Sequence, residues 1–334
     1  MKPTSWADIS RYRSEMMGAA MLFIILFHVA LSPSDPFFGL RRCGNVGVDM
    51  FLFLSGVGLW YSWTKQPSAI HFFKRRYIRV YPTWLAVACL FYIPRFLSHP
   101  ATPESTIDLA GDIILNWDFW LNDELTFWYV PAIMMLYTFA PAYMRLIEKH
   151  PGCRWMPVLM IVWCVAVQWV GPIHGAVGHI EIFWSRVPIF FIGINLGWAV
   201  KERRTIDGVT TWLSMLVFAS TAALCIYLEQ QQHGRFPLFI ERMVYIPMSI
   251  TLILLLAKVF NHSPKWLLRG LAFIGTLSLE IYLLHVQFVL LKVERLDLHY
   301  WPTFAITLAC SLPLAWMLHK GVSYITDTIQ KQRK

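Results

Sequence analysis

Two histidines within apolar segments are the side chains best suited to proton transfer. His28 lies in the segment FIILFHVAL, and His285 lies in LEIYLLHVQF. An unperturbed imidazole has a pKa of about 6.5, so near neutral pH it can serve as a general base or as a nucleophile. A helix would place Tyr282 on the same face as His285, which makes this phenol a candidate for binding a substrate. The alternative for both histidines is a buried ring that hydrogen-bonds to a backbone carbonyl or to a neighbouring helix.

The segment HFFKRRYIRVYP, residues 71–82, carries the densest cluster of positive charge. Arg76 and Arg79 would share one face of a helix, and Lys74 and Arg75 add to the local field. Guanidinium groups hold phosphates through charge-assisted, bidentate hydrogen bonds. These residues are therefore candidates for binding an anionic cofactor. The alternative is contact with the anionic headgroups of lipids.

An acidic residue, Asp49, lies in the apolar stretch GNVGVDMFLFLSG together with Ser55. A carboxylate at membrane depth needs a partner, which Arg41, Arg42 or a histidine in the same pocket would supply. Asp49 is therefore a candidate for orienting a catalytic histidine, and Ser55 is a candidate for contacting a substrate.

The longest polar connection, residues 98–125, alternates acidic and aromatic side chains. Flat rings stack on the C–H faces of a sugar, while carboxylates accept hydrogen bonds from its hydroxyl groups. Glu124 is the candidate for such a contact. The alternative is an aromatic belt at the membrane interface. The acidic residues are Glu104, Asp108, Asp112, Asp118, Asp123 and Glu124, and the aromatic ones are Trp117, Phe119 and Trp120.

The composition excludes a soluble globular protein. Hydrophobic residues make up 57% of the 334 residues and charged residues 15%, whereas soluble domains have about 45–50% and about 25%. Lipid must therefore be the main solvent of the chain, which also argues against a disordered chain and a disulfide-stapled secreted domain. The six cysteines include no CxxC pair, and no metal site is predicted.

A helix that spans a membrane needs roughly 20 mostly apolar residues. We predict an all-α integral membrane protein, a bundle of about ten transmembrane helices that forms a single domain over residues 1–334, with no separate soluble domain. The first of these helices is expected to be retained rather than cleaved. The expected spans are residues 15–33, 44–63, 78–97, 126–146, 155–172, 182–200, 209–228, 239–259, 270–291 and 301–319.

The distribution of Lys and Arg predicts the orientation of these spans. With both termini in the cytoplasm, only eight of the 29 basic residues fall on the outer side, as the positive-inside rule requires. The net charge of +9 is thereby explained without a nucleic-acid partner. The eight outer residues are Arg41, Arg42, Arg95, Arg186, Arg235, Arg242, Lys292 and Arg295.

Five segments of the sequence, in this order, resemble the acyltransferase-3 family of integral membrane acyltransferases. They extend over residues 10 to 290, approximately, and the number of expected spans is similar to that of the family. Trp128 belongs to the fourth segment, and the last one contains Tyr282 and His285. The segments are MGAAMLFIILFH, GNVGVDMFLFLSGVGL, FFKRRYIRVYP with Arg76 and Arg79 as an RxxR motif, TFWYVPAIMMLYTFAP, and SLEIYLLH.

The resemblance implies an acyl-CoA-dependent O-acyltransferase of the bacterial inner membrane, with acetyl-CoA as the expected donor. The acceptor would be a hydroxyl of a cell-surface or lipid-linked carbohydrate at the outer face. Acyl-CoA would be a co-substrate, no cofactor would be bound permanently, and membrane lipid would be the other partner.

The resemblance also implies roles for the candidate residues. Arg76 and Arg79 would bind the phosphates of acyl-CoA, and His28 would act as general base or transiently accept the acyl group. His285 or Asp49 would orient His28 or help to hold the acceptor. The remaining candidates are Arg75 and Lys74 for the donor, and Ser55, Tyr282, Trp128 and Glu124 for the substrate.

The sequence departs from the family pattern at two places. The family often has an arginine eleven residues before the histidine of the first span, where this chain has Met17. Arg13 lies about 60° around the helix from His28 and is a possible substitute. An acidic pair that often follows the tryptophan of the fourth span is replaced by Ile133 and Met134. A transporter or flippase for a small polar solute, or an inactive structural relative, are the alternatives.

Overall fold

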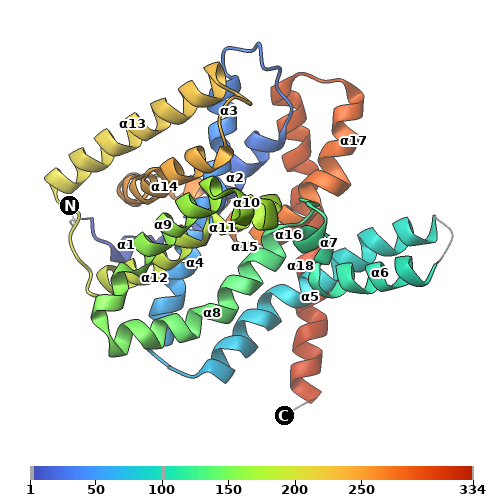
Figure 1. The fold of residues 1–334 in the computed structure, drawn as a ribbon, viewed down its shortest axis with the longest axis horizontal. Helices are drawn as coiled ribbons and strands as arrows, with labels where there is room; N and C mark the ends of the chain where they lie inside the picture. The colour runs from blue at the N-terminus through green and yellow to red at the C-terminus, as the bar shows by residue number, and fades with distance from the viewer. Residues whose placement is uncertain (1–3, 99–101, 333–334) are drawn as a thin grey trace.

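The protein is helical throughout the part of the chain that the computed structural model describes, residues 4–98 and 102–332. The one pairing of extended backbone in these residues is an isolated antiparallel bridge between Ser5 and Thr205. The helices form a bundle from which one hairpin, α5 and α6, projects to one side (Figure 1). The long C-terminal helix, α18, extends from the bundle in another direction.

Seven helices of the described residues are long and apolar enough to cross a membrane, and the number rises to nine if each of two bent pairs is one span. The bent pairs are α10–α11 with α12, at 43°, and α15 with the segment that begins at α16, at 61°. The chain is thus a multi-pass membrane protein. The seven are α3–α4 (Phe38–Arg42 and Val46–Trp63, joined by η1, Cys43–Asn45), α5 (Ala69–Leu97), α8 (Tyr129–Lys149), η2–α9 (Pro151–Trp155 and Met156–Trp169), α13 (Gly208–Gln231), α14 (Leu238–Phe260) and α18 (Tyr300–Gln332).

The remaining elements are shorter and lie at the N-terminus, at the ends of the long helices and within the bent pairs. They are α1 (Ala7–Arg11), α2 (Arg13–His28), α6 (Pro103–Leu115), α7 (Trp117–Leu121), α10 (Gly171–Val177), η3 (Gly178–Ile180), α11 (Glu181–Trp184), α12 (Val187–Lys201), α15 (Lys265–Thr276), α16 (Ser278–Leu284), the π-helix η4 (His285–Leu290), α17 (Leu291–Val293) and η5 (Glu294–Leu296).

The first predicted span, residues 15–33, is wrong at its C-terminal end. Helix α2 ends at His28, and Val29 already has an extended backbone with ψ of 128°. Pro33 disfavours helix at Ser32, so the helix could not have continued to residue 33 in any case. His28 therefore lies at the last position of a 16-residue helix rather than within a longer one.

Two other predicted elements also differ from the structure. The predicted span 270–291 breaks at Leu277, between α15 and α16, and a π-helix begins at His285. The predicted polar connection 98–125 contains two helices, α6 and α7. Helix α6 starts at a capping box, in which the side chains of Thr102 and Ser105 each bond to the backbone N–H of the other residue. Pro103 occupies the first helical position, where proline is favoured, so the local sequence specifies the start of this helix.

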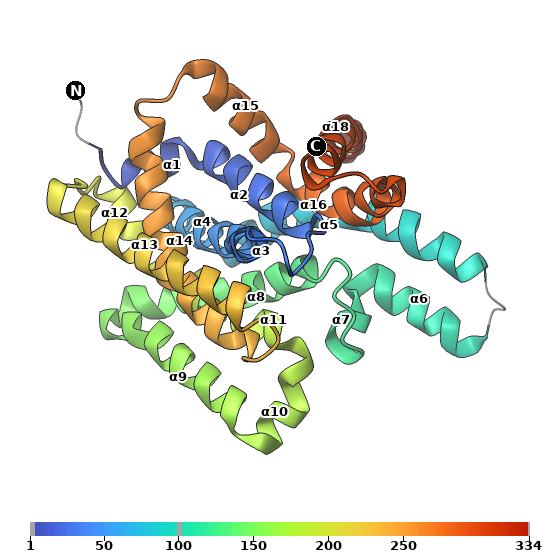
Figure 2. The ribbon, with the colours of Figure 1, turned by 90° about the horizontal axis from the view of Figure 1, so that it is seen from above.

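A contact between glycines holds α2 against α15, and the two helices run side by side (Figure 2). A Cβ atom on Gly275 would lie 1.8 Å from the carbonyl oxygen of Ser14, and one on Gly18 would lie 2.0 Å from that of Leu271. Small residues of this kind allow helix backbones to approach closely in membranes. Because α15 leads into the segment that carries His285, this contact fixes the position of His285 relative to His28.

Helix α4 is the most buried of the long helices and forms the centre of the bundle. It packs along α12, where a Cβ on Gly56 would lie 2.3 Å from the carbonyl oxygen of Phe190 and one on Gly193 would lie 2.4 Å from that of Phe53. The same kind of backbone contact therefore fixes α4 against the second half of the bundle.

We expect the substitution Gly275→Ala to lower the stability of the protein by about 1–3 kcal/mol, the usual cost of overpacking a core. The added methyl group would force α2 and α15 apart. Thermal unfolding in detergent measures the effect. Gly270→Ala on the same helix is the matched control, because a Cβ there meets nothing within 4 Å. Equal melting temperatures for the two variants would contradict the prediction.

Candidate active site

The two predicted histidines are in direct contact. The Nε2 atom of His285 lies 3.3 Å from Nδ1 of His28, and the ring centroids are 4.9 Å apart in an edge-to-face arrangement. His28 is partly exposed, whereas His285 is 1% exposed. The structure thus brings together residues that are 257 positions apart in the sequence.

The hydrogen bonds around the two rings determine which nitrogen carries the proton. Nδ1 of His285 lies 2.9 Å from the carbonyl oxygens of both Ile281 and Tyr282, so it must be the donor and Nε2 the acceptor. Nδ1 of His28 faces that acceptor and also lies 2.8 Å from the carbonyl oxygen of Ile24, so it must carry a proton. We therefore assign the unprotonated, basic nitrogen of the pair to Nε2 of His28.

The π-helix contributes to this arrangement because His285 is its first residue. Short π-helical segments within helices are frequent at functional sites. Here the π-helix begins at His285, within one turn of the two carbonyl groups that accept from its ring. The bend at Leu277 and the π-turn together place the ring of His285 against the end of α2.

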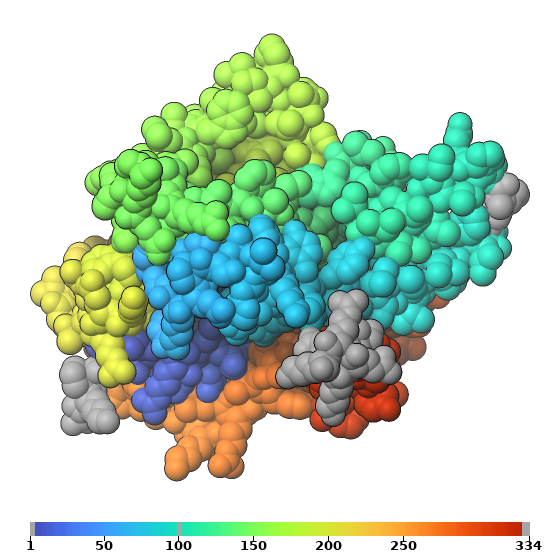
Figure 3. Space-filling model, turned by 90° about the horizontal axis from the view of Figure 1, so that it is seen from below, coloured from blue at the N-terminus to red at the C-terminus, as the bar shows by residue number. Residues whose placement is uncertain are grey.

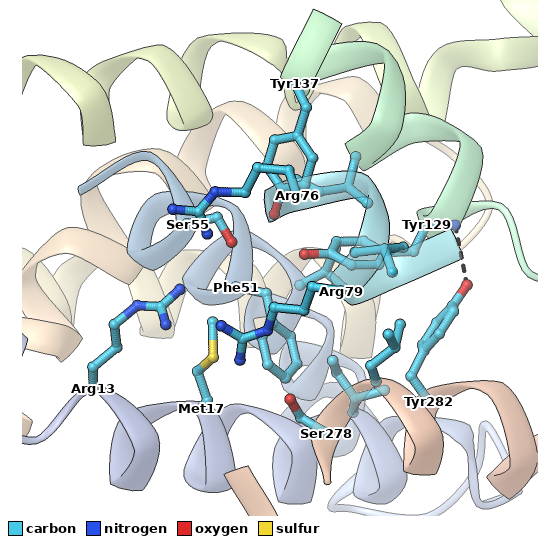
Figure 4. Close-up of a pocket in the computed structure, with 15 residues that line it drawn as sticks. Arg13, Met17, Phe51, Ser55, Arg76, Arg79, Tyr129, Tyr137, Ser278 and Tyr282 are labelled. Atoms are coloured by element: carbon cyan, nitrogen blue, oxygen red, sulfur yellow. Dashed lines mark hydrogen bonds between the residues drawn. The ribbon is translucent and has the colours of Figure 1, made fainter. Parts of the chain in front are cut away.

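A cavity of about 90 Å³, called here the inner cavity, leads toward the histidines. Figure 4 shows the guanidinium groups of Arg13, Arg76 and Arg79 at one end and Tyr282 at the other. The phenol oxygen of Tyr282 accepts a hydrogen bond of 3.0 Å from the backbone N–H of Tyr129. The lining residues also include Ile24, whose carbonyl oxygen contacts His28. The cavity therefore ends one helical turn away from the histidine pair, and neither imidazole lines it.

A second cavity of about 230 Å³, the arginine cavity, adjoins the first, and both are lined by Arg13, Arg76 and Arg79. Arg75 also lines it. No aspartate or glutamate is among the described residues that line either cavity. Three guanidinium groups without a carboxylate partner there form a site for an anion that carries more than one negative charge.

Arg13 is a member of this site that the sequence indicated only as a possible substitute. It lies one turn before Met17 on α2, and its Nε donates to the carbonyl oxygen of Leu54 over 3.3 Å. Gly58 leaves room for it, because a Cβ at that position would lie 3.3 Å from the Arg13 Nε atom. Arg13 thus supplies a guanidinium group to the cavity that Met17 also lines.

The structure separates the remaining donor candidates. Arg75 lines the arginine cavity, but Lys74 is exposed and lines neither cavity.

Two of the candidates for binding a substrate, Ser55 and Tyr282, line the inner cavity. Residues that the sequence did not single out also line it, namely Tyr129, Tyr137 and Ser278. No motif distinguishes these three from ordinary membrane-helix residues.

The prediction that Asp49 pairs with Arg41, Arg42 or a pocket histidine is wrong. Its Oδ2 atom accepts from Nε of Arg186 over 3.2 Å, and both side chains are 1% exposed. Arg42 instead bonds to Glu229. The sequence could not identify the partner of Asp49, because several outer arginines were equally available.

Arg186 is held by further contacts that tie α4 to the start of α12. Its Nη2 donates to Asn45 over 3.1 Å and its Nη1 to the carbonyl oxygen of Ile182 over 3.3 Å. The guanidinium carbon lies 5.4 Å from the ring centroid of Trp128. The structure therefore places Asp49 and Trp128 at this arginine and gives neither a contact with the histidines.

The outer connection has a polar cavity of its own, about 330 Å³ in volume, between α5 and α6. Its lining includes Tyr92, Asp108, Asp112 and Asp118. Burial raises the pKa of Asp112 to about 7. A hydrogen bond from the backbone N–H of Asp118 acts in the opposite direction but does not outweigh the burial. Glu124 is partly buried beside this region but does not line the cavity.

No cluster of three or more His, Cys, Asp or Glu side chains that could hold a metal ion occurs in the described residues. The side chains that the structure brings together, an imidazole pair near three guanidinium groups, are suited to proton transfer next to a phosphate-like anion.

Comparison with known protein families identifies the family of the chain. Residues 18–320 match the family model of the acyltransferase-3 group, which is described as an acyltransferase domain. The chain belongs to the acyltransferase-3 family. The match contains both histidines and the arginines of α5. No curated protein and no solved structure matches the chain significantly.

We expect Asp49→Ala to destabilise the protein by about 3–5 kcal/mol, because it leaves the charge of Arg186 buried without its partner. The double variant Asp49→Leu with Arg186→Met should recover most of that loss. Thermal unfolding in detergent gives both values. An Asp49→Ala protein that is as stable as wild type but lacks activity would show that Asp49 acts in catalysis instead.

The raised pKa of Asp112 predicts how stability changes with pH. The unfolded chain ionises this group near pH 3.9, whereas the folded chain retains the proton up to about pH 7. The folded state therefore binds more protons in this interval, and stability falls as the pH rises through it. We expect Asp112→Asn to flatten the dependence and to raise the melting temperature above pH 7. The Glu104→Gln variant, at an exposed position of the same helix that does not line this cavity, should keep the wild-type slope.

Proposed function

We propose that the protein is an O-acyltransferase of the bacterial inner membrane that uses cytoplasmic acyl-CoA, with acetyl-CoA as the donor. The acceptor is a hydroxyl of a cell-surface or lipid-linked carbohydrate on the outer side. The bundle has about ten spans in this proposal, with α2 as the first, and both termini are cytoplasmic. The observation that supports it most directly is the basic nitrogen of His28 near the end of a cavity system that is lined by three arginines.

The arginines account for donor binding. Arg13, Arg76 and Arg79 would hold the diphosphate of CoA, with Arg75 contributing to the field. The inner cavity, at about 90 Å³, has less than half the volume of the arginine cavity, so the arginine cavity is the better place for the bulky nucleotide. The nucleotide would therefore stay on the cytoplasmic side, and the pantetheine arm would extend past Tyr282 toward His28.

The histidine pair accounts for the chemical step. Nε2 of His28 takes the proton from the acceptor hydroxyl while the oxygen of that hydroxyl attacks the thioester carbonyl. The C–S bond then breaks, the CoA thiolate leaves, and it takes the proton from His28, so that the products are an ester and the CoA thiol. His285 is a positioning residue, because its Nε2 holds the proton on Nδ1 of His28 and thereby keeps Nε2 of His28 basic.

The surroundings of His28 are polar around the C-terminal end of α2, as an acceptor with hydroxyl groups requires. Helix α2 ends there, and the backbone N–H of Ala30 donates to Glu294 over 3.2 Å. The phenol of Tyr300 donates to the carbonyl oxygen of Leu26 over 2.9 Å. A carbohydrate hydroxyl would approach His28 from this side, opposite to the donor.

We expect purified wild-type protein to be stabilised by acetyl-CoA, and the variant Arg76→Ala with Arg79→Ala to lose this effect. A ligand that binds only the folded state at 100 times its Kd adds about 2.7 kcal/mol, which a thermal shift measures easily. Lys74→Ala is the matched control, since this cation lies on the same helix but lines neither cavity. An unchanged shift in the double variant would contradict the assignment of the donor site.

The variant His28→Ala should still bind acetyl-CoA but transfer the acetyl group to membrane carbohydrate about 10²–10⁴-fold more slowly, the range that general-base catalysis contributes. Incorporation of labelled acetyl in membrane vesicles measures the rate. Full activity of His28→Ala would rule out this mechanism. Uptake of a polar solute without consumption of acetyl-CoA would favour a transporter.

A further inference from the structure

A third cavity, called here the mouth cavity, adjoins the arginine cavity on the side away from the histidines. Its volume is about 390 Å³, and it shares Ser10, Tyr61 and Val200 with the arginine cavity. The volumes of the three cavities therefore fall from about 390 to 230 to 90 Å³ toward the histidine pair. A ligand with a wide head and a thin arm fits this sequence of volumes.

Four cations line the mouth cavity, and none of them belongs to the RxxR motif. They come from three separate parts of the chain: α1, the α4–α5 connection, and the end of α12 with the residues after it. Arg11 lies 3.9 Å from Asp8, and Lys65 lies over the ring of Tyr61 at 4.4 Å. Lys201 and Arg203 have no carboxylate contact among the described residues. The four are Arg11, Lys65, Lys201 and Arg203.

Backbone hydrogen bonds hold the walls of the mouth cavity together. The N–H of Trp6 donates to the carbonyl oxygen of Arg204 over 2.8 Å, and that of Ile206 donates to Thr4 over 2.8 Å. The side chain of Asn261 on the far end of α14 joins this assembly, because it accepts from Tyr12 and donates to Asp8. The cations therefore lie around a cavity whose walls are joined by hydrogen bonds between separate segments of the chain. Figure 3 shows a face where the N-terminal, α4–α5 and α12–α13 segments meet, coloured dark blue, light blue and yellow.

We propose that the mouth cavity binds a second phosphate group of the acyl donor, separate from the diphosphate at Arg13, Arg76 and Arg79. Coenzyme A carries such a group, the 3′-phosphate on its ribose, at the end of the molecule opposite to the thioester. This inference rests on the proposed function and extends it. Lys201 and Arg203 are the residues that select CoA over donors that lack the 3′-phosphate.

The cations of the RxxR motif alone would not give this selectivity. A ligand that carries only a diphosphate would be satisfied by the arginine cavity and would leave the mouth cavity without a charge partner. A phosphate in the mouth cavity gains charge-assisted hydrogen bonds from Lys201 and Arg203, which have no carboxylate contact among the described residues.

The test compares the affinities of purified protein for CoA and for 3′-dephospho-CoA, measured in detergent without anionic lipid. We expect wild type to bind CoA at least about tenfold more tightly, the equivalent of one charge-assisted contact. The variant Lys201→Gln with Arg203→Gln should lose this preference and bind 3′-dephospho-CoA as wild type does, which also shows that it is folded. Lys74→Gln with Lys149→Gln, two exposed cations that line none of the three cavities, should keep the preference.

Each other result contradicts the inference in a recognisable way. Equal affinity of wild type for CoA and 3′-dephospho-CoA would overturn it and leave the proposed function standing. No binding of either compound would overturn the proposed function, and this inference with it. If phosphatidylglycerol stabilises wild type but not the Lys201→Gln, Arg203→Gln variant, and CoA shows no preference, the mouth cavity holds a lipid headgroup instead.

Discussion

The contact between α2 and α15 is the constraint on which the candidate active site depends. His28 is the last residue of α2, and His285 follows α15 by a bend and a short helix. Nε2 of His285 can lie 3.3 Å from Nδ1 of His28 only if the two helix backbones are held closely together. Gly18 and Gly275 allow this approach, since any side chain at either position would collide with the backbone of the other helix. Two glycines that lie apart from the histidines thus determine the geometry of the histidine pair.

The distribution of charge is the second constraint. Arg13, Arg76 and Arg79 line cavities that no described carboxylate lines, whereas the carboxylate of Asp49 is bonded to Arg186 and that of Glu280 lies 2.8 Å from Nδ1 of His319. Like charges that are close together destabilise a fold unless a ligand neutralises them. The arginines thus lower stability in the empty protein, and a polyanionic donor would remove that repulsion when it binds. This is the usual relation between stability and function at a binding site.

The sequence was a good guide to features that depend on composition and short spacing. The apolar length of the helices and the arginines three residues apart on one face correspond to structural features, because local spacing determines both. The sequence also singled out the two histidines as polar residues in apolar segments, although their contact depends on tertiary packing. It could not show how α2 ends, where the span of α15 breaks, or that Asp49 selects Arg186 rather than Arg41 or Arg42. Those outcomes depend on tertiary packing, and a single sequence holds no information on which of several equivalent partners will be adjacent.

The departure at Met17 is an instructive case of the same limit. Considered by position, a methionine in place of the family's arginine suggests a lost charge and an inactive protein. In the structure Arg13 reaches the same cavity from one helical turn away, and Gly58 leaves the space that its guanidinium group occupies. The proposed binding of an anionic donor requires a positive charge in the cavity rather than a residue at a given position. A long, flexible side chain one turn away on the same face can satisfy that requirement, since a helical turn advances only about 5.4 Å. The charge count of the cavity is therefore the better criterion for activity in this chain than the identity of residue 17.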